Sequence, residues 1–143
     1  MASADYDGTI VLWNLVSGAV KCRLHTPRAA EDEGVDASAV YALRFLQTRR
    51  EVPDAGSLVA TGGAGRVFFW HTFGVGQLVA LFTLPPKTGL NAADAHESVV
   101  VSALALTDDE QRLYVADTLG FVYAYDISGY CTGRGVKPVG QVG

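Results

Sequence analysis

The sequence predicts an all-β fold built from a repeated unit of short strands. A phrase of alternating β-branched and aromatic residues follows a glycine turn at three places along the chain. It ends each time at an aromatic residue, Trp13, Trp70 or Tyr125, and these lie 57 and 55 positions apart, which indicates an internal repeat. We find no stretch of ten residues that keeps helical apolar spacing without Gly or Pro. Many short strands between turns are typical of a sandwich, a barrel or a propeller.

The first expected unit has three strands, at residues 1–5, 9–15 and 19–25. An Asp-Gly turn at 7–8 separates the first two strands, because Gly adopts a positive φ without steric cost and Asp tolerates it. A Ser-Gly turn at 17–18 follows, and Pro27 ends the third strand because proline cannot donate to a ladder. Residues 28–39 are polar and are expected to form a loop.

The second and third units are each expected to have four strands, at 40–46, 57–61, 66–73 and 77–84, and at 99–107, 112–117, 121–127 and 136–142. Glycine turns at 62–65 and 74–76 divide the second unit, and the two prolines at 85–86 close it. The acidic turn at 108–110 divides the first two strands of the third unit. Because Pro138 is tolerated only at a sheet edge, the last strand is expected to be an outer one.

Composition and charge restrict the class of protein. The chain has 143 residues, 49% of them apolar, which fits one ordinary domain with its own core. Its net charge is −4 and its 11 basic residues are scattered, with only Arg49 and Arg50 adjacent, so nucleic acid is disfavoured as a direct ligand. Cys22 and Cys131 are too few and too distant for a disulfide framework. No signal peptide or membrane-spanning run is found, so we expect an intracellular, cytoplasmic protein without membrane contact.

Four segments of the sequence carry a family resemblance. They are residues 7–14 (DGTIVLWN), 67–71 (VFFWH), 122–126 (VYAYD) and the dipeptide at 95–96 (AH). Together these segments resemble the WD-repeat family of β-propellers, in which each blade has four antiparallel strands, a to d, numbered outward from a central channel. The resemblance covers residues 1–127, and the first copy of the motif is the most specific.

The resemblance implies an incomplete WD-repeat β-propeller. Residues 1–26 would supply strands b, c and d of one blade, residues 40–85 a complete blade, and residues 100–142 a third blade whose outer strand depends on the segment around Pro138. Propellers need about four to eight blades to protect their sheet edges, and fewer than three are expected here. Met1 falls at an apolar strand position, as an internal methionine would. We therefore expect a piece of a larger propeller, either a truncated gene model or a segment of a longer protein.

The family also has a polar network that joins a His before strand a, a Ser or Thr in strand b, an Asp in the b–c turn and the Trp of strand c. A fully satisfied network of this kind fixes one loop geometry. The resemblance assigns structural motif roles to Ser3, Asp7, Trp13, Trp70, His96 and Asp126. Two units depart from the pattern, since Ala64 and Leu119 stand at the Asp places and Asp36 stands near one His place.

In this family one propeller face, made by the d–a and b–c loops, binds partner proteins. The residues on these loops that we expect to contact a partner are Tyr6, Glu31, Asp32, Glu33 and Lys87. The three consecutive carboxylates favour a basic patch on the partner and would act on encounter rate and specificity, although they serve equally well to solvate a loop. The expected partners are other proteins and the remaining blades, from the same or another chain.

No catalytic, cofactor or metal site is expected. The carboxylates at 108–110 lie in a solvated turn, and the sequence has no HExxH, GxSxG or GxxxxGK[ST] pattern. The favoured function is a non-catalytic protein–protein interaction scaffold. One alternative is a structural component of a cytoskeletal or ciliary assembly. Another alternative is that the chain is part of a propeller enzyme, but Arg44 is the only ionisable residue on the two expected inner strands. The last alternative is that the chain is a non-functional product of a truncated gene model.

Overall fold

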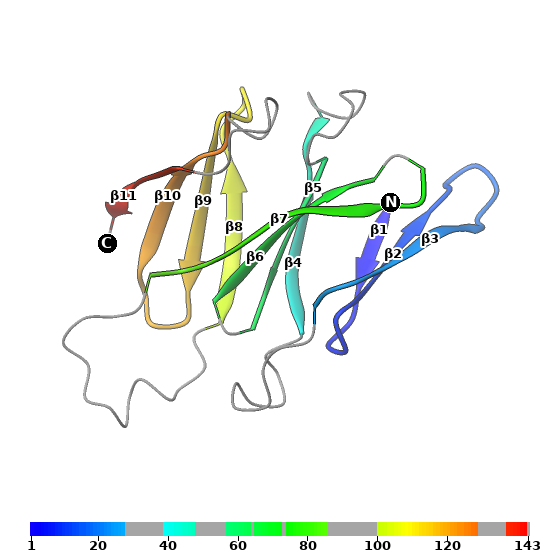
Figure 1. Ribbon diagram of the computed structural model, residues 1–143, viewed down its shortest axis with the longest axis horizontal. Helices are drawn as coiled ribbons and strands as arrows, with labels where there is room; N and C mark the ends of the chain where they lie inside the picture. The colour runs from blue at the N-terminus through cyan, green and yellow to red at the C-terminus, as the bar shows by residue number, and fades with distance from the viewer. Residues whose placement is uncertain are drawn as a thin grey trace.

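The protein is described here from a computed structural model that covers residues 1–27, 39–47, 57–63, 65–72, 74–85 and 100–128, and the backbone of 137–142. Within these residues all the extended elements are β-strands, there is no α-helix, and no helix is long and apolar enough to cross a membrane. The strands form three antiparallel sheets that stand side by side in chain order (Figure 1). The all-β class expected from the sequence is confirmed.

The first sheet has the order β1 (Ala2–Ala4), β2 (Thr9–Trp13), β3 (Val20–His25). The second has the order β4 (Val40–Phe45), β5 (Leu58–Gly62), β6 (Arg66–His71), β7 (Gln77–Thr83). The third has the order β8 (Val101–Leu106), β9 (Arg112–Asp117), β10 (Val122–Asp126), β11 (Lys137–Val142). The strand bounds lie within two residues of those expected, and β11, which contains Pro138, is an edge strand.

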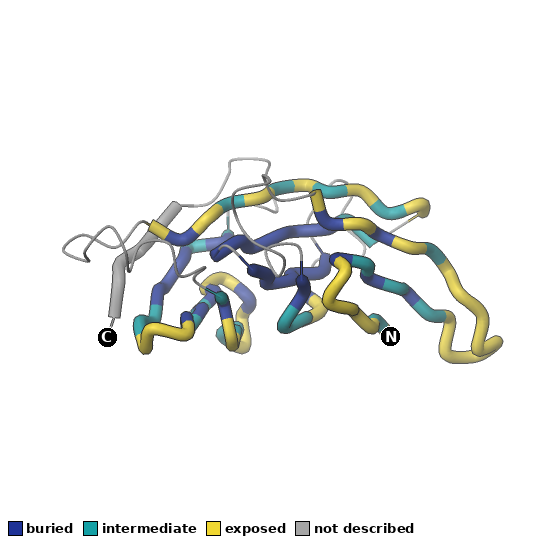
Figure 2. The backbone as a smooth tube through the Cα atoms, turned by 90° about the horizontal axis from the view of Figure 1, so that it is seen from below, coloured by how far each residue is buried: buried dark blue, intermediate teal, exposed yellow. Residues whose placement is uncertain are grey.

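The middle sheet is buried on both faces. All five residues of β5 are buried, and so are five of the six in β6 (Figure 2). Their sequences, LVATG and RVFFWH, lack the alternation of polar and apolar residues that a half-exposed strand would show. Neighbouring sheets therefore cover both sides of β5 and β6.

The contact between the first and second sheets is a cluster of aliphatic and aromatic side chains. The first sheet contributes Ile10, Leu12 and Leu24, and the second packs Phe68 and Trp70 against them. Each of these side chains is at most 5% exposed. Burying an aliphatic or aromatic side chain of this size stabilises a fold by about 1.5–3 kcal/mol, so the cluster holds the two sheets together.

The contact between the second and third sheets repeats this arrangement. Val59 and Phe69 lie on the opposite face of the second sheet, and Val115, Tyr123 and Tyr125 of the third sheet pack against them. The strand that bears Trp70 or Tyr125 thus turns its aromatic face toward the preceding sheet in both cases. The same face of the sheet is therefore used in both contacts, as an internal repeat requires.

No sheet of the described residues covers the corresponding face of the first sheet. It carries Ser3, Thr9, Val11, Trp13 and, on β3, Arg23 and His25; we call this set the open face. The burial of β2 alternates, with Ile10 and Leu12 buried toward the second sheet and Val11 and Trp13 partly exposed on the open face. Burial that alternates from one residue to the next is typical of a strand with one buried face and one exposed face.

Polar contacts also join the sheets. The Nζ of Lys21 donates to the backbone oxygen of Thr72 at 3.0 Å, between the first and second sheets. The backbone N–H of Gln47, just after β4, donates to the carboxylate of Glu110 at 2.6 Å, between the second and third. Strand β4 contacts both β1 and β8, so the first strand of the second sheet neighbours the first strand of each adjacent sheet. These contacts fix how one sheet sits on the next.

Candidate functional site

Three hairpin turns emerge at the same end of the sheets, the lower end in Figure 1. They connect β1 to β2, β5 to β6 and β9 to β10; we call this end the turn face. Their registers match, because Ala4 pairs with Ile10, Thr61 with Val67 and Ala116 with Val122. In each turn a glycine stands two residues before the pairing residue of the second strand. These glycines are Gly8, Gly65 and Gly120, with φ of 86°, 62° and 87°. Glycine adopts this conformation without a Cβ penalty.

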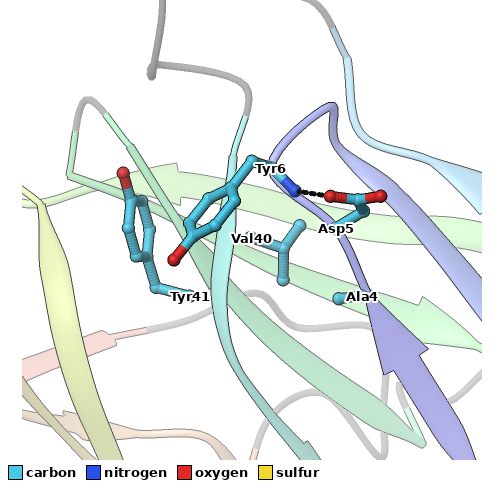
Figure 3. Close-up of a pocket in the computed structure, with 5 residues that line it drawn as sticks. All are labelled: Ala4, Asp5, Tyr6, Val40 and Tyr41. Atoms are coloured by element: carbon cyan, nitrogen blue, oxygen red, sulfur yellow. Dashed lines mark hydrogen bonds between the residues drawn. The ribbon is translucent and has the colours of Figure 1, made fainter.

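A pocket of about 220 Å³ lies on the turn face at the junction of the first two sheets. It is lined by Ala4, Asp5, Tyr6, Val40 and Tyr41 (Figure 3). The rings of Tyr6 and Tyr41 meet edge to face, with centroids 5.7 Å apart and planes at 65°. Tyr6 is 68% exposed although it is a large aromatic side chain. The pocket therefore combines an exposed aromatic ring with a carboxylate.

Backbone hydrogen bonds hold this pocket in place. The carbonyl oxygen of Asp5 accepts from the N–H of Gly8 and from the N–H of Val40, each at 3.3 Å. The first contact closes the turn and the second ties it to β4 of the next sheet. The carboxylate of Asp5 accepts the N–H of Tyr6 at 2.6 Å, which sets the direction in which Tyr6 leaves the turn. The pocket is thus built from a turn of one sheet and the first residues of the next.

The motif residues expected in the first unit lie on and beside the open face. The indole Nε1 of Trp13 donates to the Oγ of Ser3 at 2.9 Å. The carboxylate of Asp7 accepts the backbone N–H of Thr9 at 2.8 Å and so stabilises the turn. The hydroxyl of Thr9, followed by its backbone N–H, lowers the pKa of Asp7 below 3.8. Ser3 and Trp13 are brought together, while Asp7 bonds within its own turn.

A second hollow, of about 360 Å³, lies on the open face of the first sheet. Its lining residues include Asp5, Asp7, Arg23 and His25. The hollow therefore mixes both signs of charge. Among the described residues no group of three or more His, Cys, Asp or Glu is placed to hold a metal ion.

In the second sheet, Trp70 is 5% exposed and packs in the cluster against the first sheet. Its indole nitrogen makes no hydrogen bond to any residue that the structure describes. The neighbouring Arg66 is also buried: it donates from Nη1 to the carbonyl of Pro27 at 2.8 Å, and its guanidinium lies 5.1 Å from the ring centre of Phe68. This arginine ties the end of the first sheet to the second.

The third sheet holds its turn with a residue that the motif comparison did not assign. Leu119 stands at the expected Asp place, but Asp117, two residues earlier, accepts the backbone N–H groups of Leu119 and Phe121, both at 3.0 Å. Its other oxygen accepts the hydroxyl of Tyr123 at 3.3 Å. An Asp before a turn that contains Gly is a known capping pattern, so the sequence did contain a signal for Asp117.

Two other expected positions of the third sheet have distinct surroundings. Burial raises the pKa of Tyr125, which replaces the Trp of the motif, above 10.0. The carboxylate of Asp126 accepts the backbone N–H of Ser128 at 2.9 Å and its hydroxyl at 2.5 Å. Both residues therefore act within the sheet and its end, and neither lines a pocket described above.

The acidic turn of the third sheet has a structural use. Asp109 accepts the Thr107 hydroxyl at 2.6 Å and the backbone N–H of Gln111 at 3.0 Å, and the first of these lowers its pKa below 3.8. Glu110 is 7% exposed, has a φ of 54°, and binds the backbone of Gln47. The contact of Glu110 between the sheets was not expected from the sequence.

The remaining expected site residues, His96, Glu31, Asp32, Glu33 and Lys87, lie outside the residues that the structure describes. Of the residues expected on the binding loops, Tyr6 alone lies within the described part of the chain. Its partner Tyr41 was missed, because the two residues are distant in sequence and only the packing of β1 on β4 joins them.

The structure as a whole is similar to solved WD40 β-propeller domains. It is similar to the C-terminal WD40 domain of Sif2, with a TM-score of 0.63 and 18% identity, over 98% of this chain and 32% of that chain. For Saccharomyces cerevisiae Sqt1 the TM-score is 0.68 and the identity 16%, over 99% of this chain and 34% of that one. For the β-propeller domain of Myceliophteria thermophila Cps50 (Swd1) the values are 0.61 and 16%, over 99% and 37%. The sequence matches no protein-family model and no curated protein.

The fold is therefore that of an incomplete WD-repeat β-propeller, and the class expected from the sequence is confirmed. The chain spans about a third of the length of the solved structures to which it is similar. Its three sheets of antiparallel strands pack face to face, as blades do in this fold.

Proposed function

We propose that this chain is a non-catalytic protein-interaction scaffold that binds other proteins through the turn face. The observation that carries the proposal is the exposed ring of Tyr6, held against Tyr41 beside a pocket. Aromatic residues are enriched at protein interfaces, since one rigid side chain supplies a large contact area at a small entropic cost. On strands β4 and β8 the only charged residue is Arg44, so these strands present no pair of charged groups for acid–base catalysis.

A matched pair of variants tests this function. In Tyr6→Ser the exposed ring on the turn face is lost, and in Val16→Ser a side chain that is 99% exposed is lost from the turn between β2 and β3. Proteins captured by the tagged chain are compared between the variants, and the affinity of any candidate is then measured with purified components. We expect a partner that is lost with Tyr6→Ser and kept with Val16→Ser. If purified partners bind both variants equally, the turn face is not the binding surface.

The acidic cluster belongs to the same proposal. Glu31, Asp32 and Glu33, with Lys87 on the connection that follows β7, are proposed to extend the binding surface beyond the pocket. Reversing the three acidic charges to Lys should slow association with a basic partner and reduce its salt dependence. An unchanged association rate at low salt would remove this loop from the binding surface.

We also propose that further blades cover the outer surfaces of the chain, with residues 1–26 as strands b, c and d, 40–85 as a complete blade and 100–142 as a third. Support comes from the way the sheets pack. In the second and third sheets the face that bears Trp70 or Tyr125 is buried against the preceding sheet, and the open face with Val11 and Trp13 is the corresponding face of the first sheet. The outer face of the third sheet likewise exposes small apolar side chains such as Ala103 and Ala105.

Chemical labelling tests the coverage of the open face. His25 is exposed on this face, so diethyl pyrocarbonate should modify it in the purified chain. In the assembly recovered from cells, a neighbouring blade should protect it. Equal labelling in both preparations would contradict the proposal.

A further inference from the structure

We infer that the pocket between Tyr6 and Tyr41 receives an arginine side chain of the partner protein. The inference rests on the proposed function and names the chemistry of its central contact. The pocket, at about 220 Å³, is smaller than the 300–1,000 Å³ typical of small-molecule sites. It therefore fits a single side chain better than a cofactor or a folded segment.

Charge is the first reason for a cation. Asp5 lines the pocket, and its carboxylate accepts the Tyr6 N–H through one oxygen, Oδ1. Among the described residues no Lys or Arg forms an ion pair with Asp5. A carboxylate at the rim of a pocket attracts cations and repels acidic side chains.

The two rings are the second reason. The face of an aromatic ring carries partial negative charge, so it attracts a cation placed within about 6 Å of its centre. Tyr6 meets Tyr41 edge to face, which leaves much of the Tyr6 ring in solvent, as its 68% exposure shows. The hydrocarbon side chains of Ala4 and Val40 complete the lining, and they suit the methylene stem of a long basic residue.

The residues that line the pocket suit an arginine side chain better than a lysine side chain. Its planar guanidinium stacks on an aromatic ring and can donate a forked pair of hydrogen bonds to a carboxylate, whereas the lysine ammonium is compact and strongly hydrated. The lining of the pocket includes an exposed ring and a carboxylate that accepts the backbone N–H of the same tyrosine (Figure 3).

The other blades lack this combination at the corresponding turn. Asp117 occupies the place of Asp5 in the third sheet, but it is 4% exposed and binds two backbone N–H groups and the Tyr123 hydroxyl. In the second sheet Gly62 stands at that place. Within the described turns, only the first therefore combines an exposed carboxylate with an exposed aromatic ring.

The test is a nuclear magnetic resonance titration of the full chain with acetyl-Gly-Arg-Gly-amide. The matched probe has citrulline in place of arginine, which keeps the shape and removes the charge, and a third probe has lysine. We expect weak binding of the arginine peptide, with shifts at Tyr6 and Tyr41, weaker binding of the lysine peptide, and none of the citrulline peptide. Equal shifts with arginine and citrulline, or shifts that avoid both tyrosines, would overturn the inference.

Two variants sharpen the result. Asp5→Asn keeps an oxygen for the Tyr6 N–H and removes the charge, and Tyr6→Leu removes the ring. Each should weaken the arginine peptide by roughly two- to fivefold, while Asp108→Asn, in a distant turn, leaves it unchanged. If a partner protein loses affinity with Tyr6→Leu but the arginine peptide causes no shift, the arginine inference fails and the interaction face stands. If the peptide binds as expected and no partner depends on Tyr6, the proposed function fails instead.

Discussion

Trp70 and Ala60 stand in the same relation as Trp13 and Ser3, but only the second pair is joined by a hydrogen bond. Trp70 pairs with Leu58, two residues before Ala60, and the Trp13 backbone pairs with Met1, two residues before Ser3. The hydroxyl of Ser3 accepts the Trp13 indole N–H, whereas the methyl group of Ala60 cannot. The Trp70 indole is consequently left without a partner among the described residues, in a position that is 5% exposed.

Replacing Ala60 by serine should repair this defect. The new hydroxyl would lie at the place of the Ser3 hydroxyl and accept the Trp70 indole N–H. Because a buried unsatisfied donor costs about 1–3 kcal/mol, Ala60→Ser should raise the free energy of unfolding by about 1 kcal/mol. Urea denaturation measures the gain, and the indole proton of Trp70 should shift downfield in the NMR spectrum.

Ala60→Cys is the size control for this prediction. Sulfur is a weak acceptor, so the cysteine variant adds volume to a fully buried position without a comparable hydrogen bond. It should be no more stable than the parent chain. If the serine variant loses as much stability as the cysteine variant and the indole proton does not move, the predicted contact does not form.

Gly76 sets how closely the second sheet packs on the first. Its φ is +80°, and a Cβ added there would lie 2.2 Å from Cδ2 of Leu24, a residue of the buried cluster between the sheets. Gly76→Ala should therefore lower the free energy of unfolding by about 2–4 kcal/mol, from backbone strain and overpacking together. Thermal denaturation followed by circular dichroism measures the loss.

Gly74→Ala provides the matched control, since Gly74 has a similar φ of +70° with no atom within 4 Å of the added Cβ. It should cost only the backbone strain, about 1–2 kcal/mol. In a double-mutant cycle, Leu24→Ala should couple to Gly76→Ala and not to Gly74→Ala. Equal losses for the two glycine variants would mean that the turn does not press on Leu24.

Glu110 combines an unfavourable backbone conformation with a contact between sheets. Its φ of 54° is uncommon for a residue other than glycine, and its carboxylate accepts the N–H of Gln47. Glu110→Ala should destabilise the chain by about 1–3 kcal/mol, because the N–H loses its charged acceptor. Glu110→Gly should be less harmful by about 1 kcal/mol, since it relieves the backbone. Denaturant unfolding ranks the variants.

Hydrogen exchange at the Gln47 amide separates the effect of the Glu110 carboxylate from that of the Glu110 backbone conformation. Both the alanine and the glycine variant should exchange this amide faster, since neither supplies an acceptor. Glu110→Gln retains an acceptor oxygen and should keep the amide protected. Rapid exchange in the glutamine variant, or slow exchange in all three, would contradict the role assigned to the Glu110 side chain.

Asp109 should make the fold sensitive to acid. The Thr107 hydroxyl, and then the Gln111 N–H, hold its pKa below the ordinary value of 3.8. A lowered pKa contributes stability above the unfolded value, and this contribution is lost as the pH falls through the folded pKa. Unfolding in urea from pH 7 to pH 2 should therefore show a smaller acid loss for Asp109→Asn than for the parent chain.

Asp108→Asn is the comparison within the same turn. Among the described residues the structure shows no hydrogen bond to the Asp108 side chain, so Asp108→Asn removes the same charge from the same turn without removing such a contact. Asp7 lies in a different turn but should behave like Asp109, because contacts with Thr9 lower its pKa. Identical curves for Asp109→Asn and Asp108→Asn would contradict the linkage.

Much of the fold could be predicted because its signals are local. Alternation such as Ile10 and Leu12 against Val11 and Trp13 identifies a strand, and glycine identifies a turn wherever the backbone needs a positive φ, as at Gly120. These features depend on a few neighbouring residues, so the strand bounds follow from the sequence. The candidate site was harder to predict from the sequence. Tyr6 was expected on a binding loop, but its contact with Tyr41 was not predicted.

The strands, their turns and the repeat that makes one sheet resemble the next all follow from the amino-acid sequence. The tertiary structure alone decided which residues of different blades meet: Tyr6 with Tyr41, Glu110 with Gln47, and Gly76 with Leu24. The physical reason is that strand and turn signals are short-range properties of the backbone, whereas these pairs depend on the distance and angle between packed sheets. A shift of about one residue in register would turn every side chain of a strand to the other face and remove such contacts.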